Sequence, residues 1–285
     1  MSSFKKVYKA FLISTLVISG VLSIARIFLM NYFYDPSLEN YSTKTSLPTV
    51  YSILFAVCCL AAFAVFFFIK VPKNEEAVLP ESTVASLFAS SLCGFFFISS
   101  AFLVLYFTFD IFSPESFKLM LSIEEKIPLI ALIATVVFSI PSAVFFLNCE
   151  SMKYADTLFV KVMSFFPPLW CVAYLVYLYF DNSVVINNSE KLSAELSVIF
   201  MMLYLTSEAR YRIDTPRHRL HLALSLVSII AVATYCIPNI VLTVMLVLPF
   251  DEFSIYAGLQ ITVLLYMIIR TFQFLQPKES VPIEE

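Results

Sequence analysis

Residues 127–148 read IPLIALIATVVFSIPSAVFFLN, a run of bilayer length that contains no charged side chain. Crossing a hydrocarbon core about 30 Å thick takes roughly 20 apolar residues in a helix. These runs lack the alternation of barrel strands, and open strand edges cannot lie in lipid, so they predict helices. The sequence predicts an all-α, polytopic membrane protein with about eight transmembrane helices, at about 10–33, 48–69, 83–109, 127–148, 157–180, 192–209, 220–248 and 254–275.

The composition supports a membrane environment. Of 285 residues, 60% are apolar and 14% are charged, whereas a soluble domain has about 25% charged residues. A soluble protein of this size has a large wet surface that so few polar residues would not cover. The net charge of −3 is too small to indicate a nucleic-acid partner. We therefore expect membrane lipids as partners, with other membrane subunits or a homodimer as further options, and no nucleic acid.

The distribution of basic residues predicts the orientation. With the N-terminus inside, thirteen of the 18 Lys and Arg residues fall on the inner side, four fall outside, and Arg26 lies within the first span. Because inner loops carry the excess of positive charge, we expect a cytoplasmic N-terminus at 1–9, one transmembrane domain at 10–275 and a cytoplasmic tail at 276–285. The first span is expected to be an uncleaved helix.

The segment 192–209 is the weakest span, because it carries Glu195 and Glu208. If it did not cross, the cluster from Arg210 to Arg219 would move to the outer side, against the positive-inside pattern. We therefore retain it as a span, and whether it crosses the membrane fully remains a question for the structure.

Three charged residues form a candidate polar pocket near the outer side: Arg26, Asp110 and Glu195. Arg26 can pair with either acid across a helix interface. The alternative, which we favour, is a snorkelling arginine with an acidic neighbour. No acid or base is expected at the midplane, whereas proton- or sodium-coupled carriers usually need one there.

On the inner side, Glu208 and Arg212 are four residues apart and can pair along one helix face. Lys161 and Arg270 are expected to reach the inner headgroups. The loop after the sixth span is the most basic stretch and supplies candidate contacts to anionic lipid or a cytoplasmic partner. The alternative is a topology anchor. The candidate residues are Arg210, Arg212, Arg217 and Arg219.

Prolines interrupt three spans: Pro141, the pair Pro167-Pro168 at the centre of the fifth span, and Pro238-Asn239 in the seventh. Each proline removes a backbone donor and frees a carbonyl that a neighbour must satisfy. Pro167, Pro168, Pro238 and Asn239 are therefore candidates for a hinge or a cavity. Static kinks are the simpler alternative, because prolines are frequent in ordinary spans.

Small residues recur every four positions in the third span, at Ser82, Ser86, Ser90 and Gly94. Such a stripe lets a second helix approach closely, within the bundle or in a dimer. Eight aromatic residues are expected near the outer ends of the spans, where an interfacial belt explains them. They are Tyr32, Tyr34, Tyr106, Trp170, Tyr174, Tyr177, Tyr179 and Tyr256.

Signatures of known membrane chemistry are missing from the sequence. It contains no H-E-x-x-H and no G-x-S-x-G. Its six cysteines form no C-x-x-C pair, and only two histidines are present. We read the cysteines as small buried hydrophobes. No catalytic residue, cofactor or metal ligand is predicted.

Three segments in the last third of the chain can be compared with known sequences: Leu178-Tyr179-Phe180-Asp181 through Glu190-Lys191-Leu192, then Tyr204-Leu205-Thr206-Ser207-Glu208-Ala209-Arg210, and Pro216-Arg217-His218-Arg219-Leu220. On these residues the chain resembles uncharacterised multi-pass membrane proteins of clostridial type. The resemblance implies a bacterial plasma membrane and brings no assigned function.

Three functions follow from these patterns as hypotheses. The first is a non-enzymatic sensor, regulator or assembly module. The second is a carrier for a small or lipophilic solute, with a cavity near Pro167-Pro168. The third and weakest is an intramembrane enzyme that uses Glu195 or Asp110.

Overall fold

The computed structural model describes residues 3–35, 40–41, 46–68, 80, 82–107, 123–151, 157–180, 189–213 and 217–275. Within these ranges the chain is mostly helical, with one pair of two-residue strands and short connecting turns. The helices are α1 (Ser3–Phe33), α2 (Leu47–Phe68), α3 (Val84–Phe107), α5 (Ile123–Asn148), α6 (Leu158–Met163), α7 (Phe166–Phe180), α8 (Ser189–Arg212), α9 (His218–Val244) and α10 (Glu252–Phe274). The strands β1 (Tyr34–Asp35) and β2 (Asn40–Tyr41) pair antiparallel after α1.

Eight of these helical segments are long and apolar enough to cross a membrane, with α6 and α7 counted as one span. The predicted all-α bundle is therefore confirmed, and the chain is a multi-pass membrane protein. The weak sixth span is among the eight, as Glu190–Arg212. The main difference in boundaries lies in the first span, where α1 begins at Ser3 rather than near residue 10.

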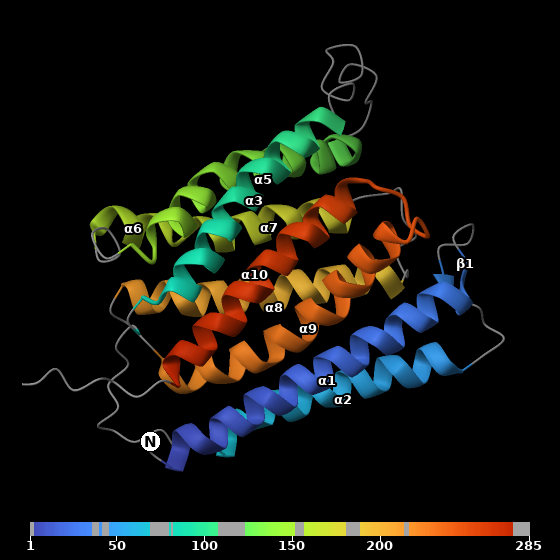
Figure 1. Ribbon diagram of the computed structural model, residues 1–285. Helices are drawn as coiled ribbons and strands as arrows, with labels where there is room; N and C mark the ends of the chain where they lie inside the picture. The colour runs from blue at the N-terminus through green and yellow to red at the C-terminus, as the bar shows by residue number, and fades with distance from the viewer. Residues whose placement is uncertain are drawn as a thin grey trace, which may run out of the picture.

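The helices form a bundle around α9 (Figure 1). One flank holds α3, α5 and α7, the middle holds α8, α9 and α10, and the opposite flank holds α1 and α2. In α9, 89% of the most apolar window is buried inside the protein, against 17% in α2. A helix that is apolar all round and buried belongs to the core, whereas α2 turns most of its surface to lipid.

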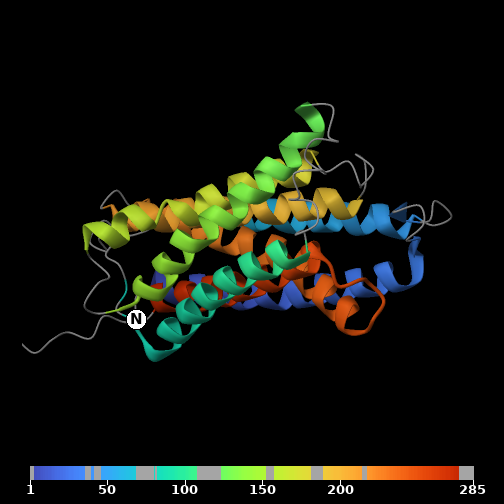
Figure 2. The same cartoon turned by 90° about the horizontal axis from the view of Figure 1, so that it is seen from above.

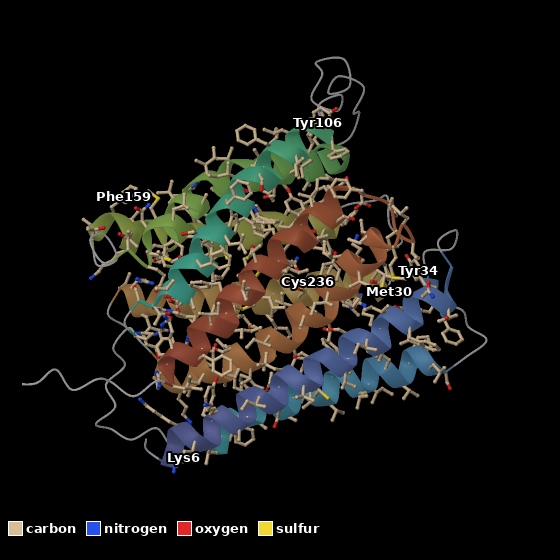
Figure 3. The ribbon with its side chains drawn as sticks, in the orientation of Figure 1. Lys6, Met30, Tyr34, Tyr106, Phe159 and Cys236 are labelled. Atoms are coloured by element: carbon tan, nitrogen blue, oxygen red, sulfur yellow. The ribbon has the colours of Figure 1, made fainter. Side chains whose placement is uncertain are left out.

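The first residues of α1 and the last residues of α10 lie at the same end of the bundle (Figures 1 and 2). We call this end the near end and the opposite end the far end. Figure 3 labels Lys6 at the near end of α1 and Tyr34 at the far end. A chain with an even number of spans has its first and last helices ending on the same side of the membrane. Which end faces the cytoplasm remains a prediction from the basic residues.

The fifth span is broken in two, at the position of the double proline. Helix α6 ends at Met163, Ser164 and Phe165 form a turn, and α7 begins at Phe166. Pro167 and Pro168 therefore lie in the first turn of α7, where a missing N–H group has no helical partner to lose. The break begins one turn earlier than the prolines themselves.

Gly94 marks a close approach between α3 and α5. A Cβ atom built on Gly94 would lie 2.7 Å from Leu147 Cγ and 3.1 Å from the carbonyl oxygen of Ala143. Only glycine fits this contact without a shift of α5. Ser86 and Ser90 are buried on the same helix, so the small-residue stripe faces a neighbour inside the bundle.

The expected aromatic belt is only partly correct. Tyr32, Tyr106 and Tyr179 are exposed at the far ends of their helices. Trp170 and Tyr174 are fully buried, and Tyr177 and Tyr256 are almost fully buried. The rings of Trp170, Tyr174 and Tyr256 pack against each other with centroids 4.3 to 5.5 Å apart. These residues form an aromatic cluster in the interior instead of an interfacial belt.

Candidate functional site

The most conspicuous polar site is a buried ion network at the near end, which we call the near-end network. It contains Glu150, Glu208, Arg212 and Arg270, each at most 3% exposed. Glu150 is the second residue after α5, Glu208 and Arg212 lie on the last turns of α8, and Arg270 lies on the last turns of α10. Glu208 and Arg270 each precede their helix end by four residues, or about 6 Å.

Arginines and glutamates alternate within this network. Arg270 Nε donates to Glu208 Oε1 at 3.0 Å, and Arg270 Nη1 lies 3.1 Å from Glu150 Oε1. Arg212 Nη2 lies 3.3 Å from Glu150 Oε1 and 3.8 Å from Glu208 Oε1. The Glu208–Arg212 pairing predicted from their spacing is confirmed. Two positive and two negative charges compensate each other, as buried charges require.

Polar groups from the surrounding helices complete the near-end network. Ser86 Oγ donates to Glu150 Oε2 at 2.8 Å, and Tyr266 Oη donates to Glu208 Oε1 at 3.2 Å. Arg212 Nη1 donates to the carbonyl oxygen of Cys149 at 2.8 Å. Burial raises the pKa of the Cys149 thiol to about 12, so this cysteine stays protonated at neutral pH and is no reactive nucleophile.

His221 of α9 faces this network. Its Nδ1 lies 3.1 Å from Ser207 Oγ, and its Nε2 lies 3.7 Å from Glu208 Oε2. The last two atoms are both buried and have no hydrogen-bond partner among the described residues. Ser207 therefore holds the imidazole at Nδ1, and the Nε2 atom on the opposite edge of the ring faces the Glu208 carboxylate.

A second ion pair lies toward the far end. Arg26 of α1 is 3% exposed and pairs through Nη2 with Glu190, in the first turn of α8. Tyr41 Oη donates to Glu190 Oε1 at 2.8 Å. Burial and the charge of Glu190 raise the pKa of Tyr41 above its usual range, so its hydroxyl remains a donor. Arg26 thus has an acidic partner, but a different one from the two that the sequence suggested.

Arg26 also supplies a hydrogen bond that the backbone of α9 lacks at its proline. Arg26 Nη1 donates to the carbonyl oxygen of Thr234 at 3.0 Å. Thr234 precedes Pro238 by four residues, and proline has no N–H to offer this carbonyl. Asn239 Nδ2 donates to the carbonyl oxygen of Tyr235 at 2.9 Å. Pro238 and Asn239 therefore lie in a continuous helix whose freed carbonyl has found a partner.

The remaining predicted site residues are placed as follows. Glu195 lies on α8 and is half-buried, whereas Asp110 lies outside the described residues. Arg217 is exposed, and Arg219 Nη2 donates to the carbonyl oxygen of Phe67 at 2.8 Å, which connects α9 to α2. Arg210 is half-buried.

Two predicted positions need correction. Arg212 was expected to contact lipid or a partner, and Arg270 was expected to reach the headgroups. Both arginines instead point into the bundle and are at most 3% exposed. Position along a helix does not reveal which side of that helix faces its neighbours.

Sequence reasoning missed Glu150, His221 and Tyr266 as members of this site. A signal was present in the spacing of polar residues. Tyr204, Glu208 and Arg212 recur every four residues on α8, while Tyr266, Arg270 and Gln273 follow a three-to-four spacing on α10. Polar residues with helical spacing on an otherwise apolar span indicate its interior face.

Metal binding finds no support in the part of the chain that the structure describes, where no group of three or more His, Cys, Asp or Glu side chains comes together. The six cysteines are unpaired, and five of them are buried. Comparisons of the chain with protein-family models, with curated proteins and with solved structures find no match. The function is therefore inferred from the geometry of these sites.

Proposed function

We propose that this chain is a non-enzymatic membrane module, acting as a sensor, regulator or assembly subunit in a bacterial plasma membrane, with both termini in the cytoplasm. The observation that carries the proposal is the near-end network. Its charges are compensated by one another inside the protein: Arg270 lies within 3.1 Å of both glutamates, and Arg212 within 3.8 Å of both. Ion-coupled carriers and many enzymes use a charged group that is available to the substrate, and these four charges are occupied with one another.

A network of mutually compensated charges can hold its helices in one arrangement, and in this sense it can act as a conformational latch. It connects the end of α5 with α8 and α10, and Arg26 connects α1 with α8 and α9 at the other side. Buried ion pairs add little net stability, but they favour one arrangement of their partners over others. Regulatory proteins switch by repacking such pairs between discrete states. The exposed Arg217 and the half-buried Arg210 remain candidates for contact with a cytoplasmic partner or anionic lipid.

The experiment has two arms. The purified chain in phosphatidylethanolamine and phosphatidylglycerol liposomes is tested for saturable uptake of labelled amino acids, sugars, phosphate and a lipophilic cation. In native membranes the chain is cross-linked, and variants Arg217→Ala and Lys6→Ala are compared, because both residues are exposed near the same end. We expect no saturable uptake, and a fixed-stoichiometry cross-link that weakens in Arg217→Ala but not in Lys6→Ala. Saturable uptake of any tested solute would contradict the proposal.

A carrier for a small or lipophilic solute is the second candidate, and one observation favours it. The fifth span breaks at Ser164 and Phe165, inside the span, and carriers use interrupted helices. Uptake that is present in the native chain and lost in Pro167→Ala/Pro168→Ala would establish this function instead.

A further inference from the structure

Three buried hydrogen-bond donors in or beside the aromatic cluster have no partner in the part of the chain that the structure describes. Trp170 Nε1, Tyr174 Oη and Gln260 Nε2 are buried, and none forms a hydrogen bond with the described residues. All three residues are 0% exposed. Leaving such groups unsatisfied is unfavourable, so several buried donors without a partner call for an explanation such as a bound water or ligand. Their clustering indicates a missing acceptor.

The three donors lie within about one helical turn of each other along the bundle. Trp170 and Tyr174 are one helical turn apart on α7, and Tyr256 and Gln260 are one turn apart on α10. The ring of Tyr256 contacts those of both Trp170 and Tyr174, with centroids 5.5 and 4.3 Å apart. Because α7 and α10 run in opposite directions, Trp170 and Gln260 both lie one turn closer to the near end than the contact between Tyr174 and Tyr256.

The orientation of Gln260 is fixed from α8. Ser197 Oγ donates to Gln260 Oε1 at 2.7 Å. The amide oxygen is thereby satisfied, and the amide N–H groups remain to be used. The site accordingly offers an indole N–H, a phenol O–H and an amide N–H, and each of these can donate to an acceptor.

The rings and side chains in direct contact with these donors are uncharged, whereas Asp251 and Glu252 lie toward the far end, at the start of α10. Phe97 packs edge-on against Trp170 with centroids 5.4 Å apart, and Thr135 Oγ1 lies 2.9 Å from Tyr256 Oη. The near-end network and the Arg26–Glu190 pair lie nearer the helix ends. A charged ligand would lack a counter-charge here. Ligand sites are typically apolar and aromatic with a few placed polar groups.

We propose that Trp170, Tyr174 and Gln260 form a binding site for a small, uncharged, lipophilic molecule that carries a hydrogen-bond acceptor such as a carbonyl oxygen. Leu169, next to Trp170, is 42% exposed on the outer surface of α7, so the site lies one helix away from lipid. This inference deepens the proposed function and rests on it in one respect, since it names the class of molecule that the module would sense.

The test uses the single tryptophan of the chain, which is Trp170 itself. The full-length protein in detergent is titrated with cyclohexanone and, in parallel, with methylcyclohexane, which has a similar size and no acceptor. We expect a saturable change in tryptophan emission with the ketone and none with the hydrocarbon. In Tyr174→Phe the affinity for the ketone should fall about tenfold, the equivalent of one hydrogen bond.

Two further variants make the result decisive. Tyr179→Phe changes an exposed tyrosine on the same helix and should bind the ketone like the native chain. Gln260→Met removes the third donor and should also weaken binding if Tyr174→Phe fails to fold, as judged by circular dichroism. Equal responses to ketone and hydrocarbon, unchanged affinity in the folded variants, or no saturable change (ordered water only) would overturn the site. A persisting cross-linked partner would then leave the proposed function standing.

Discussion

Arg26 Nη1 donates to the carbonyl oxygen of Thr234 at 3.0 Å, across the interface between α1 and α9. Pro238, four residues after Thr234, cannot supply the N–H that this carbonyl would receive in an unbroken helix. The proline and the arginine therefore depend on each other, although they lie far apart in the sequence. In lipid no water replaces such a bond.

This relationship predicts a coupling between two substitutions. Arg26→Met should destabilise the folded protein, because Glu190 loses its arginine and the Thr234 carbonyl loses its side-chain donor. In a Pro238→Ala background, the new N–H can bond to Thr234, and the loss should be smaller by about 1 kcal/mol. Unfolding in mixed micelles would measure both losses. Equal losses in the two backgrounds would show that the carbonyl contact contributes nothing.

The near-end network makes Arg270 sensitive to substitution. Arg270→Met should cost about 3–5 kcal/mol of unfolding free energy, because two buried carboxylates would share one arginine. Arg217→Met, at an exposed arginine near the same end, should stay within about 0.5 kcal/mol of the native chain. Adding Glu208→Gln to Arg270→Met should recover part of the loss by restoring neutrality. A double variant less stable than the single one would refute charge compensation.

The close approach of α3 and α5 predicts opposite effects at two glycines. Gly94→Ala should destabilise the bundle by about 1–3 kcal/mol, because the new methyl group meets Leu147 and the backbone of Ala143. Gly20→Ala meets nothing within 4 Å, and it should be neutral or stabilising by about 0.5–1 kcal/mol, since alanine favours a helix. Thermal unfolding of the two variants side by side checks this, and a reversed order would contradict the packing.

The position of the double proline predicts tolerance. In Pro167→Ala/Pro168→Ala, the new N–H groups can bond to the carbonyls of Met163 and Ser164, which would join α6 to α7. Because the prolines lie in a first helical turn, their loss should cost less than about 1 kcal/mol. Hydrogen exchange across residues 158–180 should become slower. Faster exchange there would mean that the prolines hold the span together.

The sequence was sufficient to predict the eight spans, because apolar length alone decides whether a helix can cross a bilayer. It was also sufficient for the Glu208–Arg212 pair, whose spacing is a local property of one helix. It misassigned Arg212 and Arg270, since position along a span gives depth and leaves the facing direction open. Lipid and a protein interior are equally apolar, so hydropathy does not separate the two sides of such a helix.

The interior aromatic cluster illustrates the same ambiguity. Tyr179 and Tyr177 are two residues apart on α7, yet Tyr179 is 68% exposed and Tyr177 is 7% exposed. Glu150 was missed for another reason: it follows the fourth span and belongs to a linker in any hydropathy reading. Only the packing of α3, α8 and α10 around the end of α5 brings it into the bundle.

The most direct test of the account is the sidedness of the two bundle ends. Single cysteines replace Lys6, Arg217, Ser46 and Leu246 in a variant without the native cysteines, and intact cells are treated with a membrane-impermeant maleimide. Lys6 and Arg217 lie at the near end, whereas Ser46 and Leu246 lie at the far end. We predict labelling at residues 46 and 246 and protection at residues 6 and 217 until the cells are opened. Labelling that places residues 6 and 217 on opposite faces of the membrane would contradict the eight-span bundle.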